Sequence, residues 1–475
     1  MKKTSLFWSL LVMGALIGMM AFTIGIFHDQ ALNGGIQLVL LITAALTSII
    51  AVFFFGTKWK AIEEQITANF LRIVPAIIIL LLIGSLAGSW MVSGIIPTLI
   101  YYGLNMMHSN FFLISTCVIC CIVSLMTGSS WTTIATIGVA LLGIGQVQGF
   151  SNGWVAGAII SGAYFGDKLS PLSDTTVLTS TVANTPLFTH IRYMLYTTVP
   201  SITIALIVYG IAGYTRQTPD THQITLFAEV LKNNFNISPW LLIVPVLTGI
   251  LIVKKTPPIV VLFVSSILAA IFASFFQTPL LQELAGESKN VVISCAKGAM
   301  ITLFGATNIE TANETLNGLI ATRGMSGMLN TIWLIICAVC FGGAMSASGM
   351  LDSITRLFRR MMNGRISTVT ATVASGITFN VSTADQFISI VLSGEMFSDV
   401  YKKNGFESRL LSRTTEDAVT VTSVLIPWSS CGMTQATVLG VATLTYLPYC
   451  IFNLVSPLMS IIIAITGYKI IRKKL

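Results

Sequence analysis

Charge is what this sequence has least of. Only 9% of its 475 residues are charged and 54% are hydrophobic, and the mean hydropathy is +0.84. A soluble domain has about 25% charged residues, so this composition excludes a water-facing surface. Soluble enzymes, secreted disulfide-rich proteins and nucleic-acid binders are excluded with it. The net charge of +8 therefore does not indicate a nucleic-acid partner, and we expect a lipid bilayer around the chain.

Motifs for catalysis are scarce as well. The chain has four histidines, all in or beside predicted loops, and none accompanies a nucleophile. It contains no P-loop, so transport driven directly by ATP is not supported. We expect neither an enzyme nor a bound cofactor.

The apolar residues form long continuous runs, which favour membrane helices over the alternating strands of a barrel. Four runs next to Thr127 and Thr383 are too short to cross a bilayer singly, so we predict re-entrant hairpins at 111–147 and 366–398. The remaining runs predict an all-α integral membrane protein with about ten crossings. The first run, 6–27, is expected to be a retained helix and not a cleaved signal peptide.

Basic residues fall in alternate loops, as the positive-inside rule predicts for cytoplasmic segments. This pattern places both termini in the cytoplasm. The residues assigned to cytoplasmic segments include Lys58, Lys60, Arg72, Arg192, Arg356, Arg359, Arg360, Arg365, Lys402, Lys403 and Lys469.

The two halves of the chain resemble each other. At a shift of 256 residues, 127–131 falls on 383–387 and 171–174 on 427–430, and at a shift of 255 residues 87–94 falls on 342–349. Five crossings per half make the second copy an inverted repeat of the first, an architecture typical of secondary transporters.

The repeat divides the chain into three parts. We predict a first repeat at 1–215 with a broken helix at 154–184, an external linker at 216–237, and an inverted repeat at 238–475 with a broken helix at 410–440. Residues 278–327 are expected to be a second external segment. Gly153-x-x-x-Gly157 and Gly162-x-x-x-Gly166 predict close helix packing.

Six carboxylates lie inside apolar runs, where burying a charge costs roughly 3 kcal/mol on insertion scales and therefore indicates a function. They are Asp167, Asp174, Asp385, Glu395, Glu416 and Asp417. Pro171 interrupts the first broken helix and should free carbonyl oxygens near Asp167 and Lys168. Carbonyls, hydroxyls and carboxylates are the ligands that a hard cation such as sodium prefers.

We therefore predict two facing cation sites, each made of one hairpin tip and one broken helix. The predicted ion ligands are Asp174, Asp385, Ser129, Ser173, Thr175, Asn380, Ser382, Ser429 and Ser430, and the second-tier candidates are Asp167, Lys168, Asp417, Glu416 and Glu395. Three alternatives stay open. The hydroxyls could only join helices, Asp167 could be a structural charge paired with Lys168, and Glu395 and Glu416 could reach cytoplasmic water.

Several segments together resemble a known family. The segments 166–176 (GDKLSPLSDTT) and 190–200 (HIRYMLYTTVP), with their second-half counterparts 412–417, 426–428 and 453–457, are similar to the NhaC-type sodium/proton antiporters. The resemblance implies a secondary transporter of the ion-transporter superfamily in the bacterial cytoplasmic membrane. It also implies a homodimer, in which a hairpin-bearing domain slides against a scaffold.

The leading functional hypothesis is exchange of sodium for protons, because a buried carboxylate can hold either ion but not both. The alternative is a sodium- or proton-coupled exchanger of a small carboxylate or amino acid, in which Lys168 would meet the negative group of the substrate. A passive ion channel and a membrane-embedded enzyme are further alternatives.

Overall fold

The structure of the chain, a computed structural model, is helical as predicted. It describes residues 4–27, 30–31, 33–106, 109–215, 221–254, 256–286, 290–307, 317 and 321–470. In these residues the regular elements are helices, apart from one isolated antiparallel bridge between Thr307 and Thr322. Residues 216–220 of the predicted linker lie outside the described residues.

Most helices follow the apolar runs, but three lie in the two segments predicted to be external, at 221–234, 278–285 and 291–304. Those of the first half are α1 (Leu6–Phe27), α2 (Gly35–Phe55), α3 (Trp59–Val92), α4 (Ile95–Met106), α5 (Phe112–Thr127), α6 (Ser130–Thr133), α7 (Val139–Val147), α8 (Asn152–Leu169), α9 (Asp174–Val182), α10 (Leu187–Tyr214) and α11 (Thr221–Asn234). Those of the second half are α12 (Ile243–Val253), α13 (Pro258–Phe276), α14 (Thr278–Ala285), α15 (Val291–Phe304), α17 (Leu329–Ala347), α18 (Met350–Met361), α19 (Arg365–Thr383), α20 (Gln386–Lys403), α21 (Ser408–Thr415), α22 (Val421–Ser423), α23 (Ser430–Leu439), α24 (Thr443–Tyr446) and α25 (Ile451–Thr466).

Many of these helices are long and apolar enough to cross a bilayer. Among the described residues seven meet that standard by length and composition, or nine if each of two sharply bent pairs counts as one span. About 20 residues are needed to cross the hydrocarbon core. The chain is therefore a multi-pass membrane protein, and the number of ten crossings stays a prediction.

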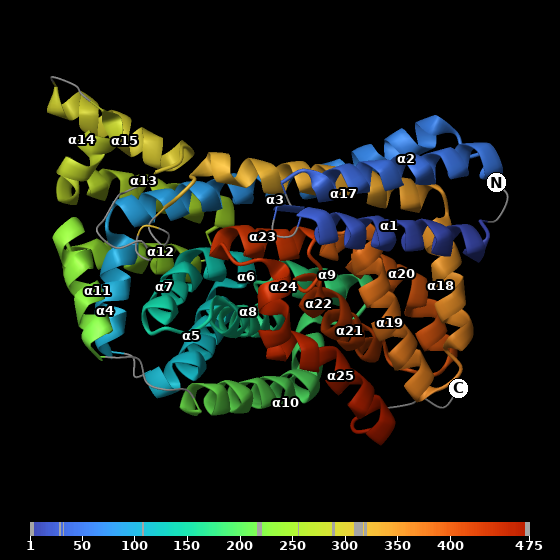
Figure 1. Ribbon diagram of the computed structural model, residues 1–475. Helices are drawn as coiled ribbons and strands as arrows, with labels where there is room; N and C mark the ends of the chain where they lie inside the picture. The colour runs from blue at the N-terminus through green and yellow to red at the C-terminus, as the bar shows by residue number, and fades with distance from the viewer. Residues whose placement is uncertain are drawn as a thin grey trace.

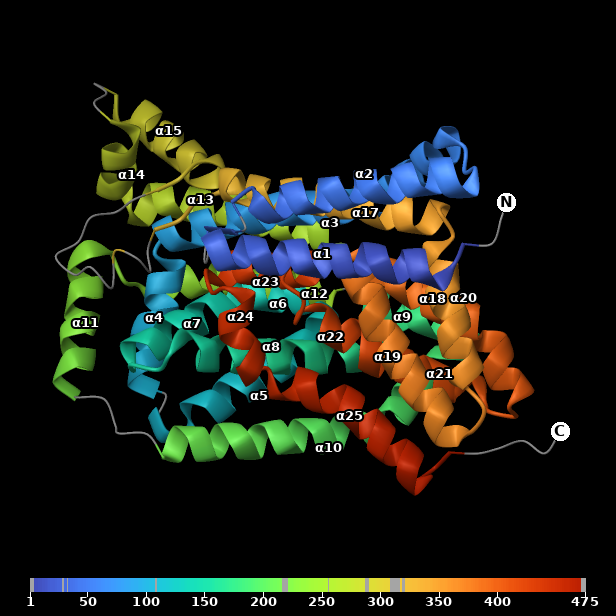
Figure 2. The same cartoon turned by 45° about the vertical axis from the view of Figure 1, so that its right-hand side comes forward.

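Two layers make up the molecule. Helices α1, α2, α3, α13 and α17 lie side by side in one layer, and the hairpins, the broken helices, α10 and α25 form the other (Figures 1 and 2). At one end of the molecule α4 and α11 run across the direction of the long helices, and α18 does so at the opposite end (Figure 1). The start of α1 and the end of α25 both lie at the end that holds α18.

Glycines bring the helices of the second layer into close contact. A Cβ atom at Gly166 in α8 would lie 2.5 Å from both the Cys121 carbonyl oxygen and the Leu125 amide nitrogen of α5. A Cβ atom at Gly153 would lie 2.6 Å from the Thr445 carbonyl oxygen. These contacts confirm the packing role predicted for the two glycine pairs.

Two long helices, α3 and α17, each end close to a glycine. The structure ends α3 before Gly94 (φ 84°) and α17 before Gly349 (φ 71°), where a glycine takes up a left-handed conformation. The short helices α4 and α18 then turn aside.

Candidate functional site

The first hairpin tip holds a carboxylate of the first broken helix. The tip turns at Gly128, with a φ of 67°, and Ser129 is the N-cap of α6, where its side chain accepts a hydrogen bond from the Thr132 amide. The amide and hydroxyl of Ser130 both donate to Oδ2 of Asp167, at 3.1 and 2.7 Å. Asp167 is therefore held by the tip and is not paired with Lys168, so the interpretation of those neighbours as an ion pair is wrong.

The second hairpin tip supplies the carboxylate itself. Asp385 is the N-cap of α20, where its Oδ1 accepts the Ile388 amide at 3.0 Å. Its Oδ2 accepts the Ser430 hydroxyl of the second broken helix at 3.2 Å, and the Ser430 amide donates to the Ala384 carbonyl at 2.8 Å. Asp385 is only 4% exposed, so tip and break enclose this carboxylate together.

The two tips and the two breaks match at the shift of 256 residues. Gly128 corresponds to Ala384, which also has a positive φ of 54°. Ser173 and Ser429 correspond as well, and each is the N-cap of the helix that follows its break. The correspondence extends across the contact between tip and break, because Asp167 corresponds to Ser423, which donates to Gln386 at 3.2 Å.

Both tips line one cavity of about 490 Å³ that also reaches the first broken helix. Its polar lining residues are Arg72, Thr127, Ser129, Thr132, Asp167, Asp174, Thr175, Thr256 and Gln386. Two carboxylates and several hydroxyls thus face a space that an ion can enter. This donor set suits a hard cation.

Asp174 lies at this cavity and not in the protein interior. It is the first residue of α9, where the positive end of the helix dipole stabilises negative charge. Its side chain is exposed, and it makes no hydrogen bond or ion pair with the described residues. The prediction that Asp174 is buried is wrong, because the break turns the start of α9 towards the cavity.

The prediction that Arg72 lies in a loop is wrong. Arg72 lies within α3 and also lines the cavity. The positive-inside pattern assigns every basic residue near the end of an apolar run to a loop. It failed for Arg72 because α3 begins 13 residues earlier, at Trp59. The hydrophilic stretch from 58 to 65 hid that extension in the sequence. An arginine inside an apolar helix was the signal that could have marked Arg72.

The expected free carbonyls near Pro171 are not free. The Thr176 hydroxyl donates to the Lys168 carbonyl at 3.0 Å and lies 3.4 Å from that of Asp167. At the second break the Ser429 hydroxyl donates to the Ile426 carbonyl at 3.0 Å. Side chains thus satisfy the carbonyls that each break releases, which leaves carboxylates and hydroxyls as the main open ligands.

Three predicted residues point elsewhere. The Ser382 hydroxyl donates to the Thr378 carbonyl and lies 3.2 Å from the Met13 sulfur of α1, away from the cavity. The Asn380 amide nitrogen donates to the Val419 carbonyl at 2.7 Å and joins α19 to the second broken helix. Glu395 is exposed on α20, whereas Glu416 is 0% exposed, so the alternative that Glu416 reaches water is wrong.

Lys168 and Asp417 form a fully buried ion pair between the two halves. The Lys168 ammonium also donates to Ser456 at 3.1 Å, and Asp417 accepts the Thr197 hydroxyl at 3.1 Å. The pair joins the two halves of the structure. Removing one partner would be costly, because it would leave the other charge buried without a counter-ion. Lys168 cannot meet a substrate in the cavity while it is bound in this way.

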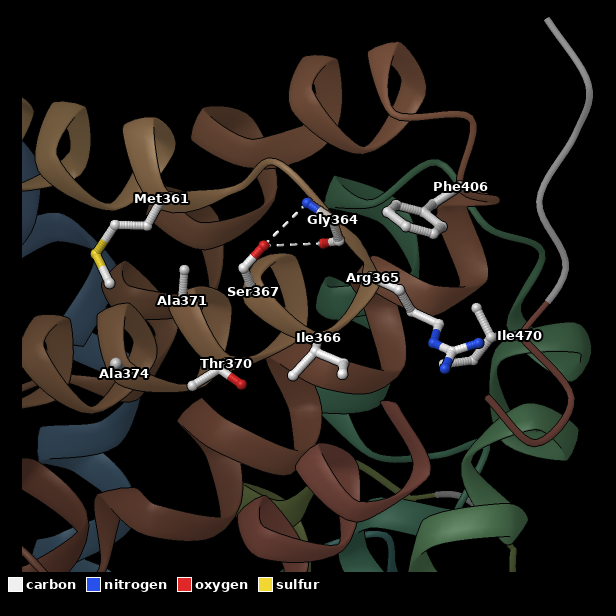
Figure 3. A pocket seen from close by; sticks show the side chains of 10 residues that line it. All are labelled: Met361, Gly364, Arg365, Ile366, Ser367, Thr370, Ala371, Ala374, Phe406 and Ile470. Atoms are coloured by element: carbon white, nitrogen blue, oxygen red, sulfur yellow. Dashed lines mark hydrogen bonds between the residues drawn. The ribbon is translucent and has the colours of Figure 1, made fainter. Parts of the chain in front are cut away.

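A larger hollow, of about 770 Å³, lies away from the site, between α18, α19 and the end of the chain (Figure 3). Arg365 lines it, but its guanidinium donates to the carbonyls of Ala464 at 2.7 Å and Ile465 at 2.9 Å. Its lining residues include no carboxylate. The hollow therefore lacks the carboxylates that line the cavity between the tips.

Residues 162–468, which hold the second tip, the second broken helix and most of the first, match the model of the Na+/H+ antiporter family. The chain belongs to this family. The resemblance to NhaC-type antiporters is therefore confirmed. Relatives of this antiporter-family protein align with it over nearly its whole length.

Three relatives show how varied the cargo is. The Na(+)/H(+) antiporter NhaC of Alkalihalophilus pseudofirmus is 36% identical over 98% of this antiporter-family chain and 96% of its own. The malate-2H(+)/Na(+)-lactate antiporter of Bacillus subtilis is 34% identical with the same coverage. The arginine/ornithine antiporter ArcD of Halobacterium salinarum is 32% identical over 92% of this chain and 88% of its own.

Proposed function

We propose that this protein exchanges sodium ions for protons across the bacterial cytoplasmic membrane. The observation that carries the proposal is the placement of Asp167 and Asp385, each held between a hairpin tip and a broken helix. Asp174 faces the cavity that both tips line. The named activity of the NhaC relative supports the same cargo.

Exchange follows from competition for these carboxylates. An ionised carboxylate in a poorly hydrated site is costly, and either a proton or a sodium ion removes that cost. The two ions cannot occupy one carboxylate together. A protein that exposes such a carboxylate to each side of the membrane in turn therefore releases one ion when it takes up the other.

The architecture that we propose for this exchange is a pair of inverted five-crossing repeats, 1–215 and 238–475, with both termini in the cytoplasm and two chains in a dimer. The matching tips and breaks support the repeat. The inversion is supported by α4 and α18, which follow corresponding helices and lie at opposite ends of the molecule (Figure 1). Alternating access then occurs between the halves.

The test is sodium-driven proton movement in everted membrane vesicles. We expect Asp174→Asn and Asp385→Asn each to abolish it at normal expression, because an amide cannot exchange a proton for sodium. Full activity in both variants would contradict the assignment of the carboxylates. Asp399→Asn, at an exposed position on α20, is the matched control.

A second candidate function is exchange of a small carboxylate or amino acid, and the cavity is the observation that favours it. Its volume of about 490 Å³ lies in the range of small-molecule sites, roughly 300–1,000 Å³. Arg72 is exposed there and suits the carboxylate of a substrate. Two relatives are named for such cargo.

Counterflow in proteoliposomes separates the two functions. Radiolabelled malate, lactate and amino acids are supplied at fixed pH, and accumulation of any of them favours the second function. Arg72→Gln would then reduce accumulation at least tenfold. Sodium-dependent proton movement without accumulation favours the first function.

A further inference from the structure

Glu416 is a buried carboxylate that the tip-and-break sites do not use. It begins the π-helical segment Glu416–Thr420 of the second broken helix and is 0% exposed. Neither of its carboxylate oxygens has a hydrogen-bond partner among the described residues. A carboxylate in that position needs a counter-ion or a proton, because burial removes the water that would otherwise stabilise its charge.

Two threonine hydroxyls lie beside this carboxylate. Thr179 comes from α9 of the first broken helix, and Thr420 from the same π segment as Glu416. Both side chains are 1% exposed, and both hydroxyls also have no hydrogen-bond partner in the described part of the chain. Two carboxylate oxygens and two hydroxyls thus gather at one buried place, and the two hydroxyls are the only donors among these four oxygen atoms.

The charges nearby do not neutralise Glu416. Lys168 and Asp167 of α8 are the charged groups that act on it most directly. Lys168 is bound to Asp417 and Ser456, so its positive charge is already balanced. Asp167 is a second acid and adds repulsion.

The other buried basic groups in this region face different partners. The Arg413 guanidinium lies over the Tyr193 ring, 4.6 Å from its centroid. On α10, the His190 Nδ1 atom lies 2.9 Å from the Ser412 hydroxyl. Neither forms an ion pair with Glu416 among the described residues.

The backbone around Glu416 is also unusual. A π-helical turn inserts an extra residue into an α-helix, and such turns are frequent at functional sites. Here it lies where α9 of the first half packs against the second broken helix. A ligand at this place contacts both halves of the chain.

We propose that Glu416, Thr179 and Thr420 form a further ion-binding site, in which a sodium ion and a proton compete for the Glu416 carboxylate. The proposal rests on the proposed sodium/proton exchange and adds a third position, behind the two tip-and-break sites. Both broken helices supply oxygen ligands to it. Occupancy of this site therefore responds to the relative position of the two halves.

The test measures binding to purified full-length protein and does not depend on transport. Sodium bound per chain is measured with radioactive sodium, and protons released per sodium ion with a pH dye. We expect Glu416→Gln to bind one sodium ion fewer than the wild type and to release correspondingly fewer protons. Unchanged sodium stoichiometry and affinity between pH 6 and 9 would overturn the proposal.

A second variant removes ligands and keeps the charge. Thr179→Val combined with Thr420→Val should weaken sodium binding at the same site at least tenfold, even if Glu416→Gln fails to fold. Wild-type affinity in this double variant would also overturn the proposal. The control is Thr414→Val, because the Thr414 hydroxyl donates to the Leu410 carbonyl of its own helix at 2.8 Å.

The same measurements distinguish this proposal from the proposed function. Wild-type protein that moves no protons with sodium in proteoliposomes would refute the exchange activity. Wild-type exchange together with unaltered sodium binding in Glu416→Gln would refute only the additional site.

Discussion

Asp385 both caps a helix and holds a proposed ion, and substitutions can separate these roles. Its Oδ1 atom caps α20 through the Ile388 amide, and its Oδ2 atom accepts the Ser430 hydroxyl. Asparagine and serine cap helices as well as aspartate does, whereas alanine does not. At the corresponding position of the first tip, Ser129 already acts as the N-cap.

The expected stabilities follow from these two hydrogen bonds. Asp385→Ala removes the cap, at about 1 kcal/mol, and leaves the buried Ser430 hydroxyl without its acceptor, at about 1–3 kcal/mol. We therefore expect Asp385→Ala to destabilise the protein by about 2–4 kcal/mol. Asp385→Asn should stay within about 1 kcal/mol of the wild type, whereas Asp385→Ser keeps the cap but lacks the second acceptor and should lose about 1–3 kcal/mol.

The transport activities of these variants should not follow their stabilities. All three variants lack the ionisable carboxylate, so we expect each to lose at least 90% of sodium-driven proton movement, a tenfold change. Thermal unfolding in detergent measures stability, and a pH dye in proteoliposomes with sodium pulses measures exchange. If Asp385→Asn transports as well as the wild type, Asp385 is only a helix cap and the reasoning is wrong.

Three further predictions concern the scaffold of the site. Lys168→Met should destabilise the protein by about 3–5 kcal/mol by leaving Asp417 buried alone, and adding Asp417→Asn should restore most of this loss in thermal unfolding. Gly166→Val should cost about 1–3 kcal/mol or more, because its side chain would overlap α5. Gly14→Ala, where nothing lies within 4 Å, should not lower the unfolding temperature; an equal loss in both variants would exclude packing as the cause. Ala384→Gly should stabilise the second tip by up to about 1 kcal/mol, since its φ of 54° strains a side chain, and a lowered unfolding temperature would contradict this.

Much of the fold was predictable because its signals are local. Long apolar runs require helices in a bilayer, whatever those helices pack against. The tips and breaks coincide with glycine, proline and hydroxyl residues near Gly128, Pro171 and Pro427, whose backbone preferences act within a few residues. The prediction that the tips lie near the broken helices came from the repeat; Asp385 and Ser430 do meet between the second tip and its broken helix, and Ser129 lines the cavity.

The partners of the charges were not predictable in this way. Lys168 pairs with Asp417, which lies 249 residues away, and not with its neighbour Asp167. Asp174 is exposed at the cavity and not buried, and Ser382 faces α1 although it has the residue type and spacing of an ion ligand. Sequence position shows which helix carries a side chain, but not which other helix lies opposite.

The sequence by itself determined that this is a helical membrane protein of the antiporter family and that a few acids within apolar runs are important. Hydropathy and backbone propensity act residue by residue, so a linear chain displays them directly. Only the tertiary structure decided which acids are bound, which one faces the cavity, and that Arg72 accompanies it there. Those properties depend on packing between distant helices, and electrostatic interactions depend on distance in space and not on separation along the chain.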